Sequence, residues 1–132
     1  MLRTRKFTIA FFGWMTFVTW ASLSSFPDDG TPTIDIPHFD KFVHFCFYLG
    51  AAVLGALFVR EIARGRFPLV KTLILVVLGA IMFGIIIEVL QYTFTVDRMG
   101  DSMDALANSL GAIFGGSVTK WLFSWRNGLK WK

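Results

Sequence analysis

Apolar residues gather into four long segments, and most polar residues fall between them. The segments cover about residues 7–26, 42–59, 72–94 and 105–123. Each is close to the ~20 residues that a helix needs to cross ~30 Å of hydrocarbon. None alternates apolar and polar residues with a period of two, as the strands of a membrane β-barrel do. The pattern predicts an all-α fold, in which a bundle of four transmembrane helices forms one integral membrane domain over residues 1–132.

The composition points to the same class of protein. Hydrophobic residues make up 55% of the 132 residues and charged residues 17%, against about 45–50% and 25% in an average soluble domain. A soluble chain of this length could not bury so much apolar surface, and a disordered chain would be richer in charge. The single cysteine, Cys46, excludes an internal disulfide framework and a zinc site built from several thiolates.

The first segment could also be a signal peptide, because basic residues precede it and small residues follow it. Its apolar run is longer than the 7–15 residues that are typical of a signal peptide. We therefore expect this segment to be retained as a helix.

Basic residues are distributed unevenly between the two sides of the predicted bundle. Of the 13 Lys and Arg residues, only Lys41 and Arg98 lie on the side where most acidic residues gather. Because basic residues stay in the cytoplasm, we expect both termini to be cytoplasmic in a multi-pass protein of the bacterial cytoplasmic membrane. Trp121, Trp125 and Trp131 would then lie near the inner interface. Anionic membrane lipids are sufficient partners for the basic charge, so no nucleic acid is expected.

Polar residues recur every three or four positions near the outer ends of three segments. This spacing places side chains on one face of a helix. The fourth segment continues that face with Gly111 and Gly115, a stripe of small residues that lets helices approach closely in lipid. The polar residues are Asp40, Lys41, His44 and Tyr48 on the second segment, Glu88 and Gln91 on the third, and Asp101, Asp104 and Asn108 on the fourth.

Depth along the helices brings three of these residues to one level. A rise of 1.5 Å per residue places His44, Glu88 and Asn108 each roughly 6–9 Å inside the outer end of its helix. An ionisable residue within a membrane span is a functional-site hypothesis by default. The three polar faces therefore predict one site.

Several of these residues also have a purely structural interpretation. Asp40 could cap the second helix, and Asp101 could cap the fourth. His44 could be a buried histidine bonded to a nearby carbonyl, and Tyr48 could belong to a belt of aromatic residues at the membrane interface. Glu88 is the hardest to explain in this way, because a carboxylate within the membrane needs a partner or a proton.

The same residues resemble the pattern of the VanZ-like family. That pattern has an Asp-Lys-x-x-His opening, a Glu-x-x-Gln turn, an Arg, and an Asp-x-x-x-Asn-x-x-Gly closing. The matching positions lie within about residues 35–116: Asp40 to His44, Glu88 to Gln91, Arg98, and Asp104 to Gly111. The resemblance implies a small bacterial integral membrane protein. The founding member is associated with resistance to the glycopeptide antibiotic teicoplanin, so the resemblance also implies a link to such resistance.

Two classes of function follow. The first is an outward-facing site for a lipid-linked phosphate or a cell-wall precursor. Lys41 or Arg98 would hold a phosphate, and His44 and Glu88 form a candidate proton-transfer pair. We favour binding over catalysis because no motif for a catalytic nucleophile is present. The second class is a non-catalytic membrane protein that supports a partner, in which the polar cluster only joins the helices.

A proton or ion pathway is a third interpretation. It would need polar residues through the membrane, and the inner halves of the second and third segments have almost none. No metal ligands and no cofactor are assigned, because one histidine among carboxylates could hold a divalent cation but the spacing is not diagnostic. The oligomeric state stays open. The candidate binding residues are Asp40, Lys41, Tyr48, Gln91, Arg98, Asp101, Asp104 and Asn108.

Overall fold

The computed structural model describes residues 5–24, 36–95, 101–124 and 130–132. These residues form four helices and contain no strand, which confirms the predicted all-helical class. The second helix is longer than the predicted span of residues 42–59, and the others begin and end within about three residues of the predicted bounds. The helices are α1 Lys6–Leu23, α2 Phe39–Ala63, α3 Leu69–Phe94 and α4 Ser102–Leu122.

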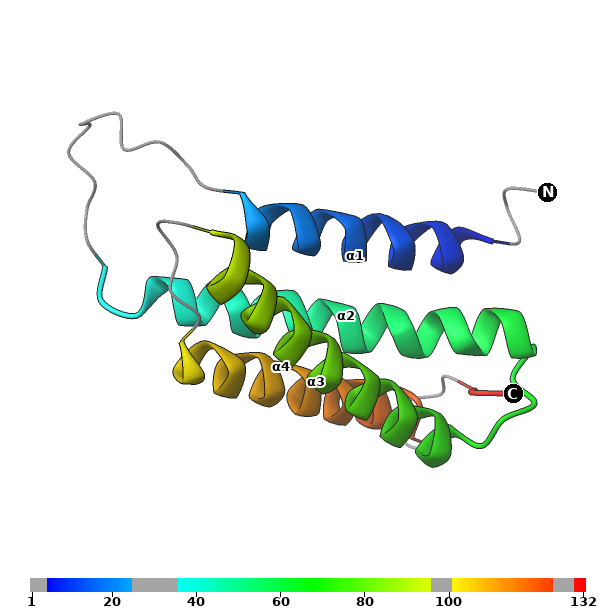
Figure 1. Cartoon of the computed structure of the whole chain (residues 1–132). Coiled ribbons are helices and arrows are strands. Elements are labelled where there is room, and N and C mark those ends of the chain that lie inside the picture. The colour runs from blue at the N-terminus through cyan, green and yellow to red at the C-terminus, as the bar shows by residue number, and fades with distance from the viewer. Residues whose placement is uncertain (1–4, 25–35, 96–100, 125–129) are drawn as a thin grey trace.

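The four helices lie side by side, and successive helices alternate in direction (Figure 1). One end of the bundle, the basic end, holds the start of α1, the connection between α2 and α3, and residues 130–132. The opposite end, the acidic end, holds the starts of α2 and α4 and the ends of α1 and α3. The first and the last of the described residues therefore lie at the same end of the bundle. Which side of a membrane this end faces remains a prediction from the basic residues.

Helices α2 and α3 are, among the described residues, long and apolar enough to cross a membrane. Their 25 and 26 residues correspond to roughly 37–39 Å. Large apolar side chains are exposed along almost the whole of α3, and an exposed apolar surface of this kind marks contact with lipid or a partner. They include Val70, Ile74, Leu78, Met82, Ile85 and Val89. The structure and composition together indicate a membrane protein; crossing of the membrane by α1 and α4 stays a prediction.

Glycines on α4 let this helix lie directly against the backbone of α2. A Cβ atom added to Gly111 would overlap the carbonyl oxygen of Phe45, and one added to Gly115 would lie 2.5 Å from the carbonyl oxygen of Leu49. Ala112, next to Gly111, is fully buried. The predicted stripe of small residues is therefore the surface through which α4 contacts α2. This contact fixes the start of α4 beside the start of α2.

The two candidate helix caps have different outcomes. Asp40 lies inside the first turn of α2, which is preceded by His38 at a φ of 63° and has no side-chain cap. The capping interpretation of Asp40 is therefore wrong, although an acidic residue in a first turn still suits the helix dipole. Asp101 does cap α4, because its Oδ1 accepts a hydrogen bond of 2.9 Å from the backbone N–H of Met103.

Candidate functional site

Lys41 joins the starts of α2 and α4 at the surface of the acidic end. Its Nζ lies 3.2 Å from Asp40 Oδ2, 3.1 Å from Asp101 Oδ2 and 3.2 Å from Asp104 Oδ1. The N–H of Met103 and then the Lys41 ammonium hold the pKa of the Asp101 carboxyl below its ordinary value. The ammonium already has three carboxylate partners, so a phosphate could bind Lys41 only by displacing some of them.

Deeper in the bundle than Lys41, the amide of Asn108 lies between His44 and Glu88. Asn108 Nδ2 donates to Glu88 Oε1 at 3.1 Å, and Asn108 Oδ1 lies 3.0 Å from His44 Nδ1. Because the amide nitrogen donates to Glu88, the amide oxygen faces the histidine, and His44 Nδ1 must carry the hydrogen. The three residues are buried, with whole-residue exposed fractions of 1% for Asn108, 7% for His44 and 8% for Glu88.

Two atoms of this buried group lack a hydrogen bond within the described part of the chain. Glu88 Oε2 is buried and has no hydrogen-bond partner. His44 Nε2 faces Asp104 Oδ2 at 3.9 Å, which is too long for a hydrogen bond. Asn108 therefore links His44 and Glu88 by hydrogen bonds, while His44 Nε2 and Glu88 Oε2 are left available to a ligand.

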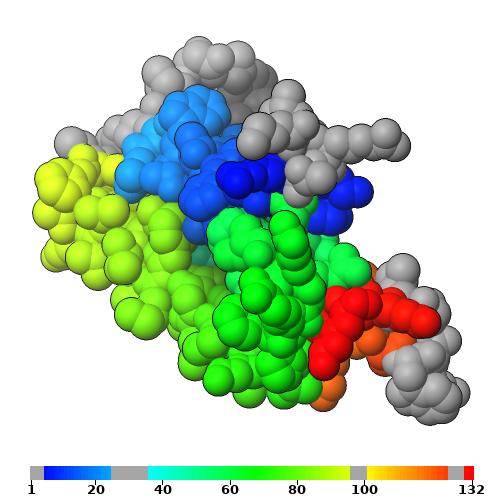
Figure 2. Space-filling view, turned by 90° about the vertical axis from the view of Figure 1, so that its right-hand side faces the viewer, coloured from blue at the N-terminus to red at the C-terminus, as the bar shows by residue number. Residues whose placement is uncertain are grey.

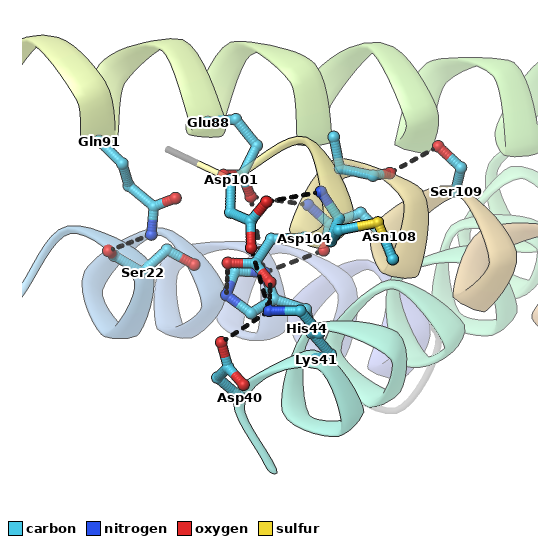
Figure 3. Close-up of polar contacts among 12 residues, drawn as sticks. Ser22, Asp40, Lys41, His44, Glu88, Gln91, Asp101, Asp104, Asn108 and Ser109 are labelled. Atoms are coloured by element: carbon cyan, nitrogen blue, oxygen red, sulfur yellow. Dashed lines mark hydrogen bonds and ion pairs between the residues drawn. The ribbon is translucent and has the colours of Figure 1, made fainter. Parts of the chain in front are cut away.

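The cluster reaches from the surface into the bundle, and Figure 3 shows its side chains converging from α2, α3 and α4. Side-chain exposure falls steadily along this path: 61% for Asp40, 43% for Asp101, 24% for Lys41, 13% for Asp104, and 9% for both His44 and Glu88. A ligand arriving at the acidic end would meet the exposed carboxylates first and the buried carboxylate of Glu88 last.

Two of the described candidate residues, Gln91 and Tyr48, make no hydrogen bond to the cluster. Gln91 points to α1, where its Nε2 donates to the backbone oxygen of Ser22 at 2.7 Å (Figure 3). Tyr48 is only 1% exposed and belongs to the apolar core, so it is not an interface-belt residue. Its hydroxyl has no hydrogen-bond partner among the described residues. Arg98 lies outside the described residues, so its predicted phosphate contact stays a prediction.

Gly84 positions the site, although it is not among the residues predicted from the sequence to form it. A Cβ atom at Gly84 would lie 3.0 Å from the Tyr48 ring and 3.2 Å from Asn108 Cβ. The missing side chain lets α4 bring Asn108 against α3, one turn below Glu88. The signal in the sequence was a glycine four residues before the charged residue, in a segment of large apolar residues.

The arrangement favours binding of cations and hydrogen-bond donors. Three carboxylates surround the single ammonium, and a fourth, Glu88, lies beside His44. The described side chains of the cluster include no Ser, Thr or Cys, and most of its polar atoms are acceptors. His44 Nδ1 and Glu88 Oε1 are 3.7 Å apart, and the side-chain amide of Asn108 forms a hydrogen bond with each of them. A general base must lie within about 2.6–3.2 Å of its proton donor, so direct proton transfer between these two residues would need a rearrangement.

Comparison with protein families identifies relatives of this chain. A family model described as VanZ/LLP1 matches residues 2–123, a range that includes all four helices and every member of the cluster. Searches among curated proteins and among solved structures give no significant match.

Proposed function

The chain belongs to the VanZ/LLP1 family, and we propose that it is a multi-pass protein of the bacterial cytoplasmic membrane that binds a lipid-linked cell-envelope molecule at its acidic end. The observation that supports this proposal most strongly is the environment of the Glu88 carboxylate. Its carboxylate is buried, one of its oxygens has no hydrogen-bond partner among the described residues, and a path of polar side chains leads to it from the surface.

A cluster that only joined helices would be expected to satisfy its buried polar atoms. An unsatisfied buried donor or acceptor costs about 1–3 kcal/mol, and each one in a native structure calls for an explanation. Gln91 shows what a simple join looks like, because it connects α3 to α1 through one short hydrogen bond. Glu88 differs because its Oε2 has no hydrogen-bond partner in the ranges that the structure describes. This difference favours a ligand over the alternative that the cluster is only structural.

The ligand that suits this cluster has donors in its head group and an apolar tail. Hydroxyl, amide and amino groups, as on the sugars and peptides of cell-wall precursors, would donate to the carboxylates of Glu88 and Asp104. The tail would lie in the bilayer beside the exposed apolar side chains of α3. A lipid-linked phosphate would be held by Arg98, or by Lys41 after it has released part of its carboxylate partners.

The lipids that co-purify with the protein test this proposal. We would extract them from wild type, Glu88→Gln and Gly79→Ala and identify them by mass spectrometry. A Cβ at Gly79 meets no atom within 4 Å, so Gly79→Ala is the matched control. Wild type and Gly79→Ala are expected to retain a lipid-linked envelope molecule, and Glu88→Gln is expected to lose at least nine-tenths of it at an unchanged melting temperature.

The structural alternative gives a different result. If the cluster only joins helices, Glu88→Gln should keep the lipids of the wild type, because the amide can still form hydrogen bonds, while Glu88→Leu should lower the melting temperature. Equal lipid content in wild type and Glu88→Gln would therefore contradict ligand binding. Cells that express the wild type are also expected to tolerate more teicoplanin than cells that express Glu88→Gln. Equal tolerance would show that the binding site does not contribute to resistance.

A further inference from the structure

We infer that His44, Glu88 and Asp104 form a binding site for one divalent transition-metal ion of the Zn²⁺ or Mn²⁺ type. One potential ligand atom from each side chain lies within 4.8 Å of those of the other two. Ion–ligand distances of about 2.0–2.2 Å place ligand atoms about 3–4 Å from one another, so small side-chain rotations would close the site. One imidazole with two carboxylates suits such ions better than Mg²⁺ or Ca²⁺, which prefer oxygen ligands alone.

Each of the three side chains has one polar atom held by a neighbour and a second atom that remains for an ion. His44 Nδ1 is bonded to Asn108, which leaves Nε2. Asp104 Oδ1 is bonded to Lys41, which leaves Oδ2. Glu88 Oε1 is bonded to Asn108, which leaves Oε2. Neighbours that hold the other atom of a ligand are typical of metal sites, where they fix its orientation.

The histidine is held in the form that binds metals. Because Nδ1 donates to Asn108, a neutral His44 carries its lone pair on Nε2. This lone pair faces Asp104 Oδ2 at 3.9 Å, so two acceptors point at each other with no hydrogen atom to share. A cation between them would satisfy both atoms.

Glu88 gives an independent indication that the cluster takes a ligand. The residue is more than nine-tenths buried, and its Oε2 has no hydrogen-bond partner within the described residues. Figure 3 shows its carboxylate directed toward His44 and Asp104. Each of the three ligands comes from a different helix: His44 from α2, Glu88 from α3 and Asp104 from α4. No short spacing along the sequence could therefore reveal this set.

A bound ion would change what the acidic end can hold. Three protein ligands leave at least one coordination position for water or another ligand, and the double positive charge would offset most of the excess of carboxylates. A phosphate oxygen could then bind the ion instead of competing for Lys41. This last consequence rests on the proposed function, whereas the metal site does not.

Metal binding can be measured on the full-length, tag-free protein in detergent. After treatment with a chelator, Zn²⁺, Mn²⁺, Mg²⁺ and Ca²⁺ would each be titrated by calorimetry, and bound metal counted by mass spectrometry. One Zn²⁺ or Mn²⁺ per chain is expected, with affinity lowered at least tenfold in Glu88→Gln and in Asp104→Asn. Glu61→Gln, which removes a carboxylate at the opposite end of α2, should change the affinity less than threefold.

Two results would overturn the inference. One is a wild-type protein that binds none of the four ions stoichiometrically. The other is wild-type affinity in both Glu88→Gln and Asp104→Asn, each checked for folding by its melting temperature. No lipid is added in this titration, so its failure leaves the lipid result standing, and loss of lipid binding leaves the metal result standing.

Discussion

The two ends of the bundle satisfy their polar groups in different ways. At the basic end, Arg60 donates to the backbone oxygens of Trp131 and Lys130, each at 2.9 Å, and its guanidinium lies 5.2 Å from the Phe123 ring. Trp131 in turn donates to the backbone oxygen of Phe67 at 2.8 Å. Figure 2 shows the last residues of the chain lying against the region of the α2–α3 connection. These contacts hold a terminal segment in place and use backbone acceptors.

Two glutamates make the difference between the ends explicit. At the basic end, both oxygens of Glu61 accept hydrogen bonds from the start of α1: from Phe7 N–H at 3.3 Å, Thr8 N–H at 2.7 Å and Thr8 Oγ1 at 2.8 Å. At the acidic end, Glu88 has one hydrogen-bond partner among the described residues, Asn108, and its buried Oε2 has none among them. A glutamate within an apolar helix is therefore not a sign of function by itself; the unpaired oxygen is what separates the two.

The prediction with the largest expected effect concerns the orientation of the bundle in the membrane, which decides the side that each end faces. Reporter fusions after Gly30, Arg64, Gly100 and the C-terminus are expected to lie outside, inside, outside and inside, because nearly all basic residues cluster at one end. This result would place the acidic end outside the cell. A C-terminal reporter outside the cell would contradict both the four-span prediction and the outward-facing site.

The contact between α2 and α4 sets the geometry of the acidic end and is the next largest test. Gly111→Ala should lower the free energy of unfolding in detergent by about 3 kcal/mol, because the new methyl group meets the Phe45 backbone and forces the helices apart. Gly79→Ala is the control, since its Cβ would meet no atom. Equal melting temperatures for the two variants would show that the stripe does not hold the bundle.

Removing the basic-end contacts should affect stability alone. Arg60→Met keeps much of the side-chain volume but removes both hydrogen bonds to the backbone, so we expect a loss of about 1–2 kcal/mol of stability. Zinc affinity should stay within threefold of the wild type, because the substitution lies at the opposite end of α2. A tenfold change in affinity would mean that the two ends are coupled, and it would contradict a purely structural role for the basic end.

The smallest expected effect is the pH dependence of stability contributed by Asp101. Its pKa is lowered in the folded protein, so its ionised form contributes stability that is present above the unfolded pKa of about 4. That stability is lost as the pH falls through the folded pKa. Asp101→Asn can still cap α4 but does not titrate.

Melting temperatures of wild type and Asp101→Asn between pH 6 and pH 3 measure this contribution. The variant should lose slightly less stability than the wild type over that range. Identical slopes would show that neither the hydrogen bond from Met103 nor the ion pair with Lys41 favours the ionised form of Asp101 in the folded protein.

The features that the sequence predicted correctly are those that depend on local pattern. Four apolar segments gave four helices, and the distribution of basic residues matched the two ends of the bundle in the described part of the chain. The small residues on the fourth segment marked its contact surface, because a spacing of four keeps Gly111 and Gly115 on one face. Hydropathy and helical period are properties of the neighbouring residues alone, so they can be read without knowing the fold.

Atomic partners were decided by the tertiary structure. Gln91 and Glu88 are three positions apart, which separates them by about 60° around the helix axis. That angle is enough for Gln91 to reach α1 while Glu88 reaches α4. In the same way, the place of Trp131 near the membrane interface stays a prediction, but its burial against Phe123 follows only from the packing. The sequence predicted the facing sides of His44 and Glu88. Only the packing of α4 against α2 and α3 put Asn108 between them and left Glu88 Oε2 with no hydrogen-bond partner in the described part of the chain. The reason is that the lateral order and rotation of helices depend on contacts between residues far apart in the sequence.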